Sequence, residues 1–277
     1  MPSRLLALPF AVGFFLFFYL AWAKDESFAI YVIPCSIIIG LIYVFAPQID
    51  WWWYKRNPPD LSDGIRRFFG ERFSFYTRLP LLKKEPFRQK VAMFNLATDF
   101  KPMVMEVVPE DAKAVISACA VQLTFGRDDF LLPAFENVVV YPHPFPSPQF
   151  PEHFHLSEIF EEDGVILFSL PHLMKSFAEP TLYYATGLHE YAKVFMLSYP
   201  DEPYPSFGDE IWEKLEAISQ FSKEAIENWI NLPYIDPLPV SIAHFFVFPD
   251  RFKEVLPEVY ATYAEIFRQD LAKKEDV

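Results

Sequence analysis

Residues 187–193 hold the pattern in this chain that comes nearest to a metal-dependent catalytic site. They read Gly-Leu-His-Glu-Tyr-Ala-Lys, so that His189 is followed by Glu190 and then, one helical turn on, by Lys193. Zinc peptidases of the His-Glu-x-x-His type bind the metal with two histidines on one helix face and use the glutamate as general base. Lysine is positively charged near neutral pH and has no lone pair for a metal. The pattern therefore lacks the second histidine of a zinc-binding helix. Whether the His-Glu pair is part of a functional site depends on the rest of the sequence.

The remaining histidines offer few alternative ligands. His153 and His155 could place two imidazoles on one side of a strand as a metal pair, but their Pro-rich loop, residues 143–155, favours surface histidines. His244 precedes two phenylalanines on a predicted helix, which favours a hydrogen-bonded interior or interface histidine. The sequence has no Gly-rich phosphate loop and no Gly-x-Ser-x-Gly nucleophile motif.

The hydrophobic pattern indicates which elements must position the motif. It lies on a helix predicted over residues 180–199, and a second helix is predicted from Pro109 to residue 123. Short apolar runs at residues 138–141 and 165–169 predict buried strands. A long amphipathic helix is predicted over residues 209–232. Because helices outnumber strands, we expect an α+β fold, mostly helical, with a small sheet.

Composition excludes several functional classes. The 277 residues are 52% hydrophobic and carry a formal net charge of -13, which argues against nucleic acid as a partner because phosphate binding needs clustered Lys and Arg. The two cysteines, Cys35 and Cys119, lie in an apolar run and in a predicted helix. Neither a disulfide framework nor a cysteine-rich zinc site is therefore expected.

The first fifty residues predict a transmembrane helical hairpin. Residues 5–23 and 28–48 are apolar runs of about twenty residues, the length that crosses a bilayer core. Only residues 24–27 separate them, as a tight polar turn. A cleaved signal peptide is the alternative, because Ala21-Trp22-Ala23 resembles a cleavage site.

Basic residues after the second run predict the orientation. Residues 51–54 form an aromatic belt, Lys and Arg follow, and Arg4 precedes the first run. The positive-inside rule then places both ends, and the domain that follows, on the cytoplasmic side of a bacterial inner membrane as a multi-pass protein. We expect residues 51–72 to be an interfacial linker, residues 73–271 a domain and residues 272–277 a charged tail. Residues 63–77 mix basic residues with Phe, and we expect them to lie along the membrane surface or to pack on the domain.

Several segments, in one order, resemble the Mlc titration factor A family of glucose-regulated zinc metallopeptidases. The resemblance covers about residues 73–270 and includes the opening motif, and it implies a zincin-like metallopeptidase domain. The segments that carry it are Phe73–Tyr76 with Leu79–Leu82, Ala112–Leu123, Val138–Pro142 with Phe145, Gly164–Ser169, Gly187–Ala192, Phe245-Phe246 with Pro249, and Leu256–Tyr260 with Phe267–Asp270.

Transferred residue by residue, the family's zinc site is incomplete. The resemblance implies His189 as first zinc ligand and Glu190 as catalytic base, but Lys193 stands at the second ligand and Ala243 at the third, a Glu in the family. The Asp that usually follows the zinc motif falls at Met196. One ligand cannot hold catalytic zinc, which needs three protein ligands and an open position. We expect an ion pair between Glu190 and Lys193, i, i+3 neighbours on a helix, in the former zinc site.

The sequence thus favours a catalytically inactive zinc-peptidase homologue, attached to the membrane by residues 5–23 and 28–48, that binds or regulates a protein partner and has no zinc. The family's enterobacterial members bind a transcriptional repressor of sugar uptake, but nothing in this chain identifies a comparable partner. The alternative is a divergent zinc peptidase that uses His189 and Glu190 with ligands from His153, His155, His172 or Glu210. A plain structural membrane protein is a third class, which predicts no cleft beside Glu190.

Overall fold

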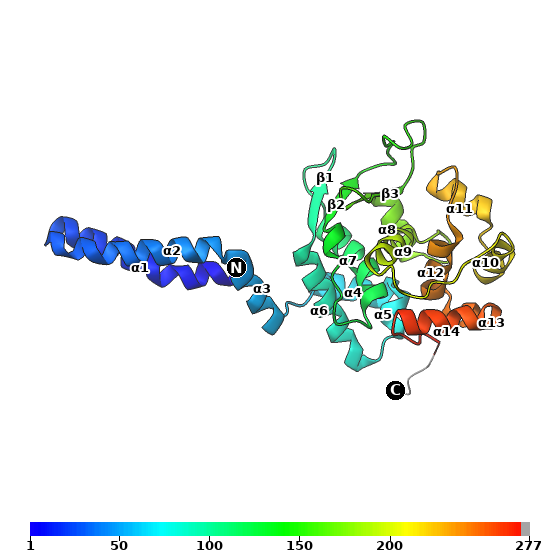
Figure 1. The fold of residues 1–277 in the computed structure, drawn as a ribbon, viewed down its shortest axis with the longest axis horizontal. Coiled ribbons are helices and arrows are strands. Elements are labelled where there is room, and N and C mark those ends of the chain that lie inside the picture. Colours follow the sequence, from blue (N-terminus) through cyan, green and yellow to red (C-terminus); the bar gives the residue numbers. More distant parts are fainter. Residues whose placement is uncertain (273–277) are drawn as a thin grey trace. The chain divides into compact units, whose positions relative to one another are not determined.

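The computed structural model describes residues 1–272, so all but the first residue of the expected charged tail lies outside the described residues. The chain forms two compact units, one of residues Met1–Pro59 and one that begins at Asp60 (Figure 1).

The first unit is helical. Helices α1 and α2 pack against each other, and Ser3 at the start of α1 donates from its backbone N and its Oγ to the Asp50 carboxylate of α3, at 2.7 and 3.0 Å. Two helical spans, Pro2–Ala23 and Glu26–Val44, are long and apolar enough to cross a membrane, with mean hydropathy of 2.1 and 2.2. Their large apolar side chains are mostly exposed, which suits lipid better than water. The helices are α1 (Pro2–Ala23), the 3₁₀ helix η1 (Glu26–Tyr31), α2 (Val32–Val44) and α3 (Ala46–Arg56).

The second unit contains a four-stranded sheet with the order β1-β2-β4-β3. Both predicted strands are confirmed as β2 (Asn137–Tyr141) and β4 (Val165–Ser169), which pair in parallel. The flanking strands β1 (Asp99–Pro102) and β3 (Ser157–Phe160) were not predicted. Since β1 runs parallel to β2 and β3 antiparallel to β4, only β3 reverses direction, and it forms one edge of the sheet.

Gly164 closes the hairpin between β3 and β4. Its φ is +59°, and a Cβ at this position would lie 2.0 Å from the carbonyl oxygen of Ala134. A glycine is therefore required both by conformation and by space. The exposed acidic turn of residues 161–163 is held in front of the edge strand by this tight connection.

Helices surround the sheet and form most of the second unit. The helix with the opening motif is α9 (Thr186–Ser198), which begins six residues later than predicted. The prediction of one helix over residues 209–232 is wrong: α10 ends at Gln220, which has a φ of +66°, and Ser222 caps α11. The other helices are α4 (Asp63–Arg72), α5 (Ser74–Arg78), α6 (Leu81–Ala97), α7 (Glu110–Thr124), the 3₁₀ helix η2 (Pro133–Phe135), α8 (Leu170–Ala178), α10 (Ile211–Ser219), α11 (Lys223–Ile230), α12 (Pro237–Val247), α13 (Pro249–Val255) and α14 (Pro257–Ile266).

Helix α9 is packed on several sides, against α7, α8, α12 and β3. The residues Tyr191, Val194 and Phe195 have no exposed surface. The approach of α7 and α8 is closest at Gly187, where a Cβ would lie 2.7 Å from Cys119 Sγ and 2.9 Å from Leu173 Cδ1. The close packing of α7, α8 and α9 at this point leaves little room for a side chain at position 187.

Gly187→Ala is expected to destabilise the second unit by about 1–3 kcal/mol, because the added methyl overpacks the junction of three helices. Gly70→Ala is the matched control: Gly70 also lies inside a helix, α4, but a Cβ there meets nothing within 4 Å. That change is expected to stabilise by about 0.5–1 kcal/mol through lower chain entropy and better helix propensity. Urea titrations of the full chain, followed by near-UV circular dichroism, measure both changes, and equal effects would contradict the proposed packing.

Candidate functional site

Helix α9 brings the motif residues to a buried position beside the edge strand. His189 is 3% exposed and Glu190 has no exposed surface. Lys193, one turn after His189, keeps 27% of its side chain in solvent. The helical period thus places a buried carboxylate between a buried imidazole and a partly exposed ammonium.

Both oxygens of the Glu190 carboxylate are occupied. Lys193 Nζ donates to Oε2 at 2.8 Å, and the Ser157 hydroxyl on β3 donates to Oε1 at 2.8 Å. Burial alone would raise the pKa of Glu190, but the charge of Lys193 and the hydrogen bonds from Lys193 and Ser157 hold that pKa below its ordinary value. The carboxylate therefore stays ionised, and the expected ion pair with Lys193 is present.

His189 is engaged by a tyrosine that sequence reasoning missed. The Tyr184 hydroxyl and His189 Nδ1 share a hydrogen bond of 2.7 Å, and both side chains are buried. Burial lowers the pKa of His189 to about 4, so the ring is neutral near pH 7. Nδ1, one of the two ring nitrogens of His189, is thus hydrogen-bonded to Tyr184.

A second imidazole, from α12, lies close to this pair. His244 is 1% exposed, and its ring centroid is 6.1 Å from that of Tyr184. The prediction that His244 is interior is confirmed, but the prediction of a satisfied histidine is wrong: neither ring nitrogen has a hydrogen-bond partner among the described residues. Burial, with a smaller contribution from His189, lowers its pKa to about 3. Ala243, its neighbour, is fully buried and presents only a methyl group.

The other candidate ligands have different partners. The expectation of a surface histidine at 155 is wrong, because a bridge to Phe145 buries the ring completely. Its Nε2 lies 3.0 Å from Glu158 Oε2 and its Nδ1 lies 2.9 Å from the His153 carbonyl oxygen. His172 instead bonds Ser169 Oγ through Nδ1 at 2.9 Å. Within residues 1–272, no three His, Cys, Asp or Glu side chains converge in a way that could hold a metal ion.

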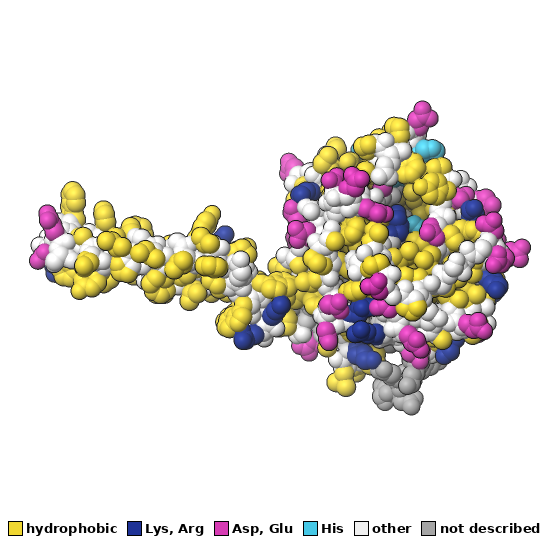
Figure 2. Space-filling model, in the orientation of Figure 1, with side chains coloured by type: hydrophobic (Ala, Val, Ile, Leu, Met, Phe, Trp, Pro, Cys, Tyr) yellow, Lys and Arg dark blue, Asp and Glu magenta, His cyan; other side chains and the backbone are white. Residues whose placement is uncertain are grey.

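A groove of about 820 Å³ lies beside α9, and Figure 2 shows this face of the domain hollowed in the region of that helix. His189 and Lys193 from α9 line it, and the edge strand β3 contributes Glu158, Ile159 and Phe160. Among the lining residues, all within the described part of the chain, Lys193 is the one basic side chain. The acidic members are Glu158, Glu161, Glu162, Asp163 and Asp236. A plain structural membrane protein, the third class considered, does not account for this groove.

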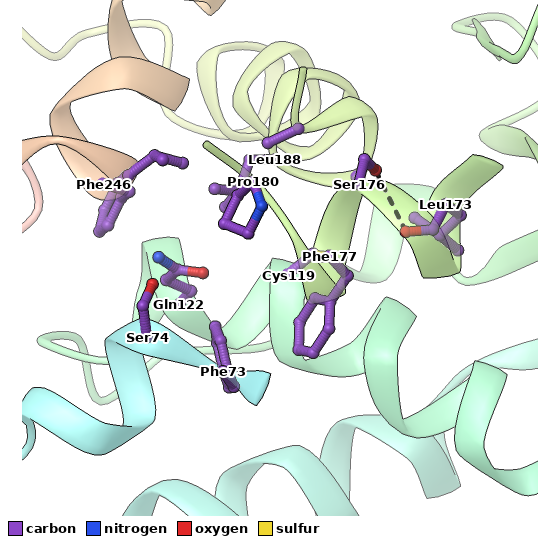
Figure 3. Close-up of a pocket in the computed structure, with 13 residues that line it drawn as sticks. Phe73, Ser74, Cys119, Gln122, Leu173, Ser176, Phe177, Pro180, Leu188 and Phe246 are labelled. Atoms are coloured by element: carbon purple, nitrogen blue, oxygen red, sulfur yellow. Dashed lines mark hydrogen bonds between the residues drawn. The ribbon is translucent and has the colours of Figure 1, made fainter. Parts of the chain in front are cut away.

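A second, much smaller cavity lies among α5, α7, α8, α9 and α12 (Figure 3). Its volume is about 20 Å³, enough for one water molecule. Cys119 lines it, and burial raises the pKa of that thiol to about 12, so the sulfur stays protonated and unreactive. This cavity is a packing gap between helices and is not large enough for a substrate.

Comparison with known protein families identifies the fold. The model of the glucose-regulated metallo-peptidase M90 family matches residues 49–196, which include His189, Glu190 and Lys193. The chain belongs to this family. The resemblance to the Mlc titration factor A family is thereby confirmed, although the match ends before α12, so the assignment of Ala243 to the third ligand rests on the resemblance alone. No curated protein matches the chain.

The family implies zinc, but the groups around Glu190 do not fit it. An ammonium stands where the second imidazole would be and occupies one oxygen of the catalytic glutamate at 2.8 Å. The other oxygen accepts from Ser157, and the whole side chain of Glu190 lies out of contact with solvent. A cation placed there would meet the positive charge of Lys193.

Lys193→Met is expected to destabilise the second unit by about 3–5 kcal/mol, because it leaves a fully buried carboxylate without its counter-charge. Adding Glu190→Gln should recover most of the loss, since the amide is neutral and its oxygen still accepts from Ser157. A double-mutant cycle on the full chain measures this coupling. The control Lys223→Met breaks an exposed pair with Glu227 at 3.9 Å and should cost under about 1 kcal/mol. An equal cost for the two lysines would contradict the role assigned to Lys193.

Acid is expected to destabilise this site through His189 and His244. Their folded-state pKa values, about 4 and about 3, lie below the ordinary value of 6.5. As pH falls below about 6.5, the two histidines become protonated in the unfolded chain but stay neutral in the folded chain. The free energy of unfolding therefore drops by up to about 1.4 kcal/mol per pH unit for each ring. His244→Leu should therefore reduce the slope of stability against pH between about pH 5 and 6, whereas replacement of the exposed His143 by Leu should not. An unchanged slope in His244→Leu would contradict burial of a neutral ring.

Proposed function

We propose that this chain is a zinc-free member of its family that has lost peptidase chemistry and acts as a membrane-attached binding protein. The observation that carries the proposal is the Glu190–Lys193 ion pair at 2.8 Å. A general base must reach the water it activates, but Glu190 has no exposed surface and its charge is paired with Lys193. His189 and Glu190 then remain as vestiges of a metal site whose other ligand positions hold Lys193 and Ala243.

The groove supports binding of an extended protein segment. Strand β3 has a neighbour on one side only, β4, and its residues line the groove. Because residues 157–159 are buried, we expect the segment to lie along the groove and to be recognised through its side chains, for which the groove's pockets supply specificity. The acidic turn at residues 161–163 and the apolar wall that includes Phe160 and Met196 favour a partner that carries both basic and apolar side chains.

The apolar helices of the first unit support attachment to a membrane. The spans Pro2–Ala23 and Glu26–Val44 have the length and composition of bilayer-crossing helices. Lys55 and Arg56 end α3 and follow the apolar spans, which favours a cytoplasmic location for the second unit at the inner membrane. In this arrangement the groove would recruit its partner to the membrane surface.

The enzyme alternative requires additional ligands near His189. The candidates named from the sequence are His153, His155, His172 and Glu210, and among the described residues no such group of three has formed. Zinc binding would therefore require both displacement of Lys193 and movement of a further ligand toward His189. The ion pair and the absence of convergent ligands in residues 1–272 both favour the binding protein.

Labelled peptides added to the purified full chain in detergent test the proposal. A peptide that alternates basic and apolar residues is expected to bind, and an acidic counterpart is not. Reversal of Glu161 and Glu162 to Lys should weaken binding by about tenfold, because it replaces attraction by repulsion at the rim. The same reversal at Glu216, an exposed residue of α10 outside the groove, is the control. No peptide should be cut, with or without added zinc; zinc-dependent cleavage that disappears in Glu190→Gln would establish the enzyme alternative.

A further inference from the structure

Two adjacent leucines at the start of α6 project into solvent. Leu81 is 78% exposed, and Leu82, at 91%, is the most exposed large hydrophobic side chain described in residues 1–272. The core-facing side of the same helix begins at Phe87 and continues through Val91, both fully buried. The leucine pair therefore lies beyond the packed part of the helix, where water solvates it at a cost.

The sequence around this pair is basic in an otherwise acidic chain. Residues 64–84 contain one acidic residue, Glu71, against a net charge of -13 for the whole protein. In the space-filling view, Lys and Arg side chains gather on the lower part of the second unit, where α6 begins, close to protruding hydrophobic side chains (Figure 2). The basic residues of the segment are Arg66, Arg67, Arg72, Arg78, Lys83 and Lys84.

The phenylalanines of the same segment play a different part. Phe69, Phe73 and Phe75 are at most 5% exposed, so they pack inside the second unit. Residues 63–77 were expected to lie along the membrane surface or to pack on the domain. The phenyl rings pack on the domain, while Arg67, Arg72 and other basic side chains remain exposed. The exposed apolar surface lies instead a few residues later, at Leu81 and Leu82.

We propose that the segment Arg78–Lys84 is a second membrane contact, in which Leu81 and Leu82 enter the headgroup region of an anionic bilayer and Arg78 and Lys84 pair with lipid phosphates. Exposed leucines flanked by basic residues match the chemistry of such a surface: apolar below the headgroups and negative at them. Two leucines and two cations bind weakly on their own. Membrane attachment through residues 2–44, on which this inference rests, raises their effective concentration at the bilayer because only residues 57–62 lie between α3 and α4.

Fluorescence labelling of the full chain in vesicles tests this contact. Cys35→Ala removes the accessible thiol, and Cys119 is buried and stays unlabelled. An environment-sensitive dye is then placed at Leu82→Cys, with Leu182→Cys as the control because that leucine is 65% exposed elsewhere in the second unit. In vesicles with about 30% anionic lipid, a lipid-borne quencher should reduce emission from position 82 by about twofold or more and leave position 182 unaffected. High salt, or Arg78→Glu with Lys84→Glu, should abolish the quenching at position 82.

A third label, at Leu16→Cys in α1, separates this inference from membrane attachment itself. Quenching at positions 16 and 82 supports both. Quenching at position 16 without quenching at position 82 would overturn the second contact and leave attachment intact. Absence of quenching at both positions would overturn attachment and the second contact together.

Discussion

A carboxylate that is completely removed from water needs compensating charge and hydrogen bonds, and Glu190 is the buried carboxylate on which the site in this protein depends. Two elements cooperate to satisfy it: α9 supplies the glutamate and Lys193, and β3 supplies the Ser157 hydroxyl. Gly187 allows α7 and α8 to approach α9 closely and so fixes where the carboxylate lies. A bound zinc ion would supply positive charge near such a carboxylate, and in this chain the ammonium of Lys193 supplies it.

The chemistry open to the site follows from this arrangement. The Glu190 carboxylate is ionised, buried and paired with Lys193, and the neutral imidazole of His189 is bonded to Tyr184. A single imidazole is fewer than the three protein ligands that catalytic zinc needs. What remains of a peptidase is the shape beside α9: a groove, an edge strand and an acidic rim. These features suit recognition of a basic, extended segment. The same acidic chain carries its exposed basic and leucine-rich segment at the start of α6, so the two surfaces attract partners of opposite charge.

How far the sequence could predict this structure depends on whether a feature is local. The runs at residues 138–141 and 165–169 are strands as predicted because short continuous apolar runs favour buried strands, and the ion pair followed from helical spacing. Strand β3 was missed because it follows a Pro-rich loop and is defined by its pairing with β4. His155 is buried by the distant Phe145, and His244 faces Tyr184 from another helix, contacts that no local pattern encodes. Gln220 could not be recognised as a helix end, since only its left-handed conformation breaks the amphipathic pattern.

Lys193 is proposed to take the place of zinc, and the metal content of the full chain tests this proposal most directly. The protein should be purified without chelators, supplied with zinc, dialysed and measured by elemental mass spectrometry. Wild type is expected to hold far less than one zinc per chain, because the ammonium of Lys193 occupies the place of a ligand and repels the cation. The combined variant Lys193→His with Ala243→Glu restores the family's ligand types and serves as the positive reference. About one equivalent of zinc in the wild-type chain, lost in His189→Ala, would contradict the account.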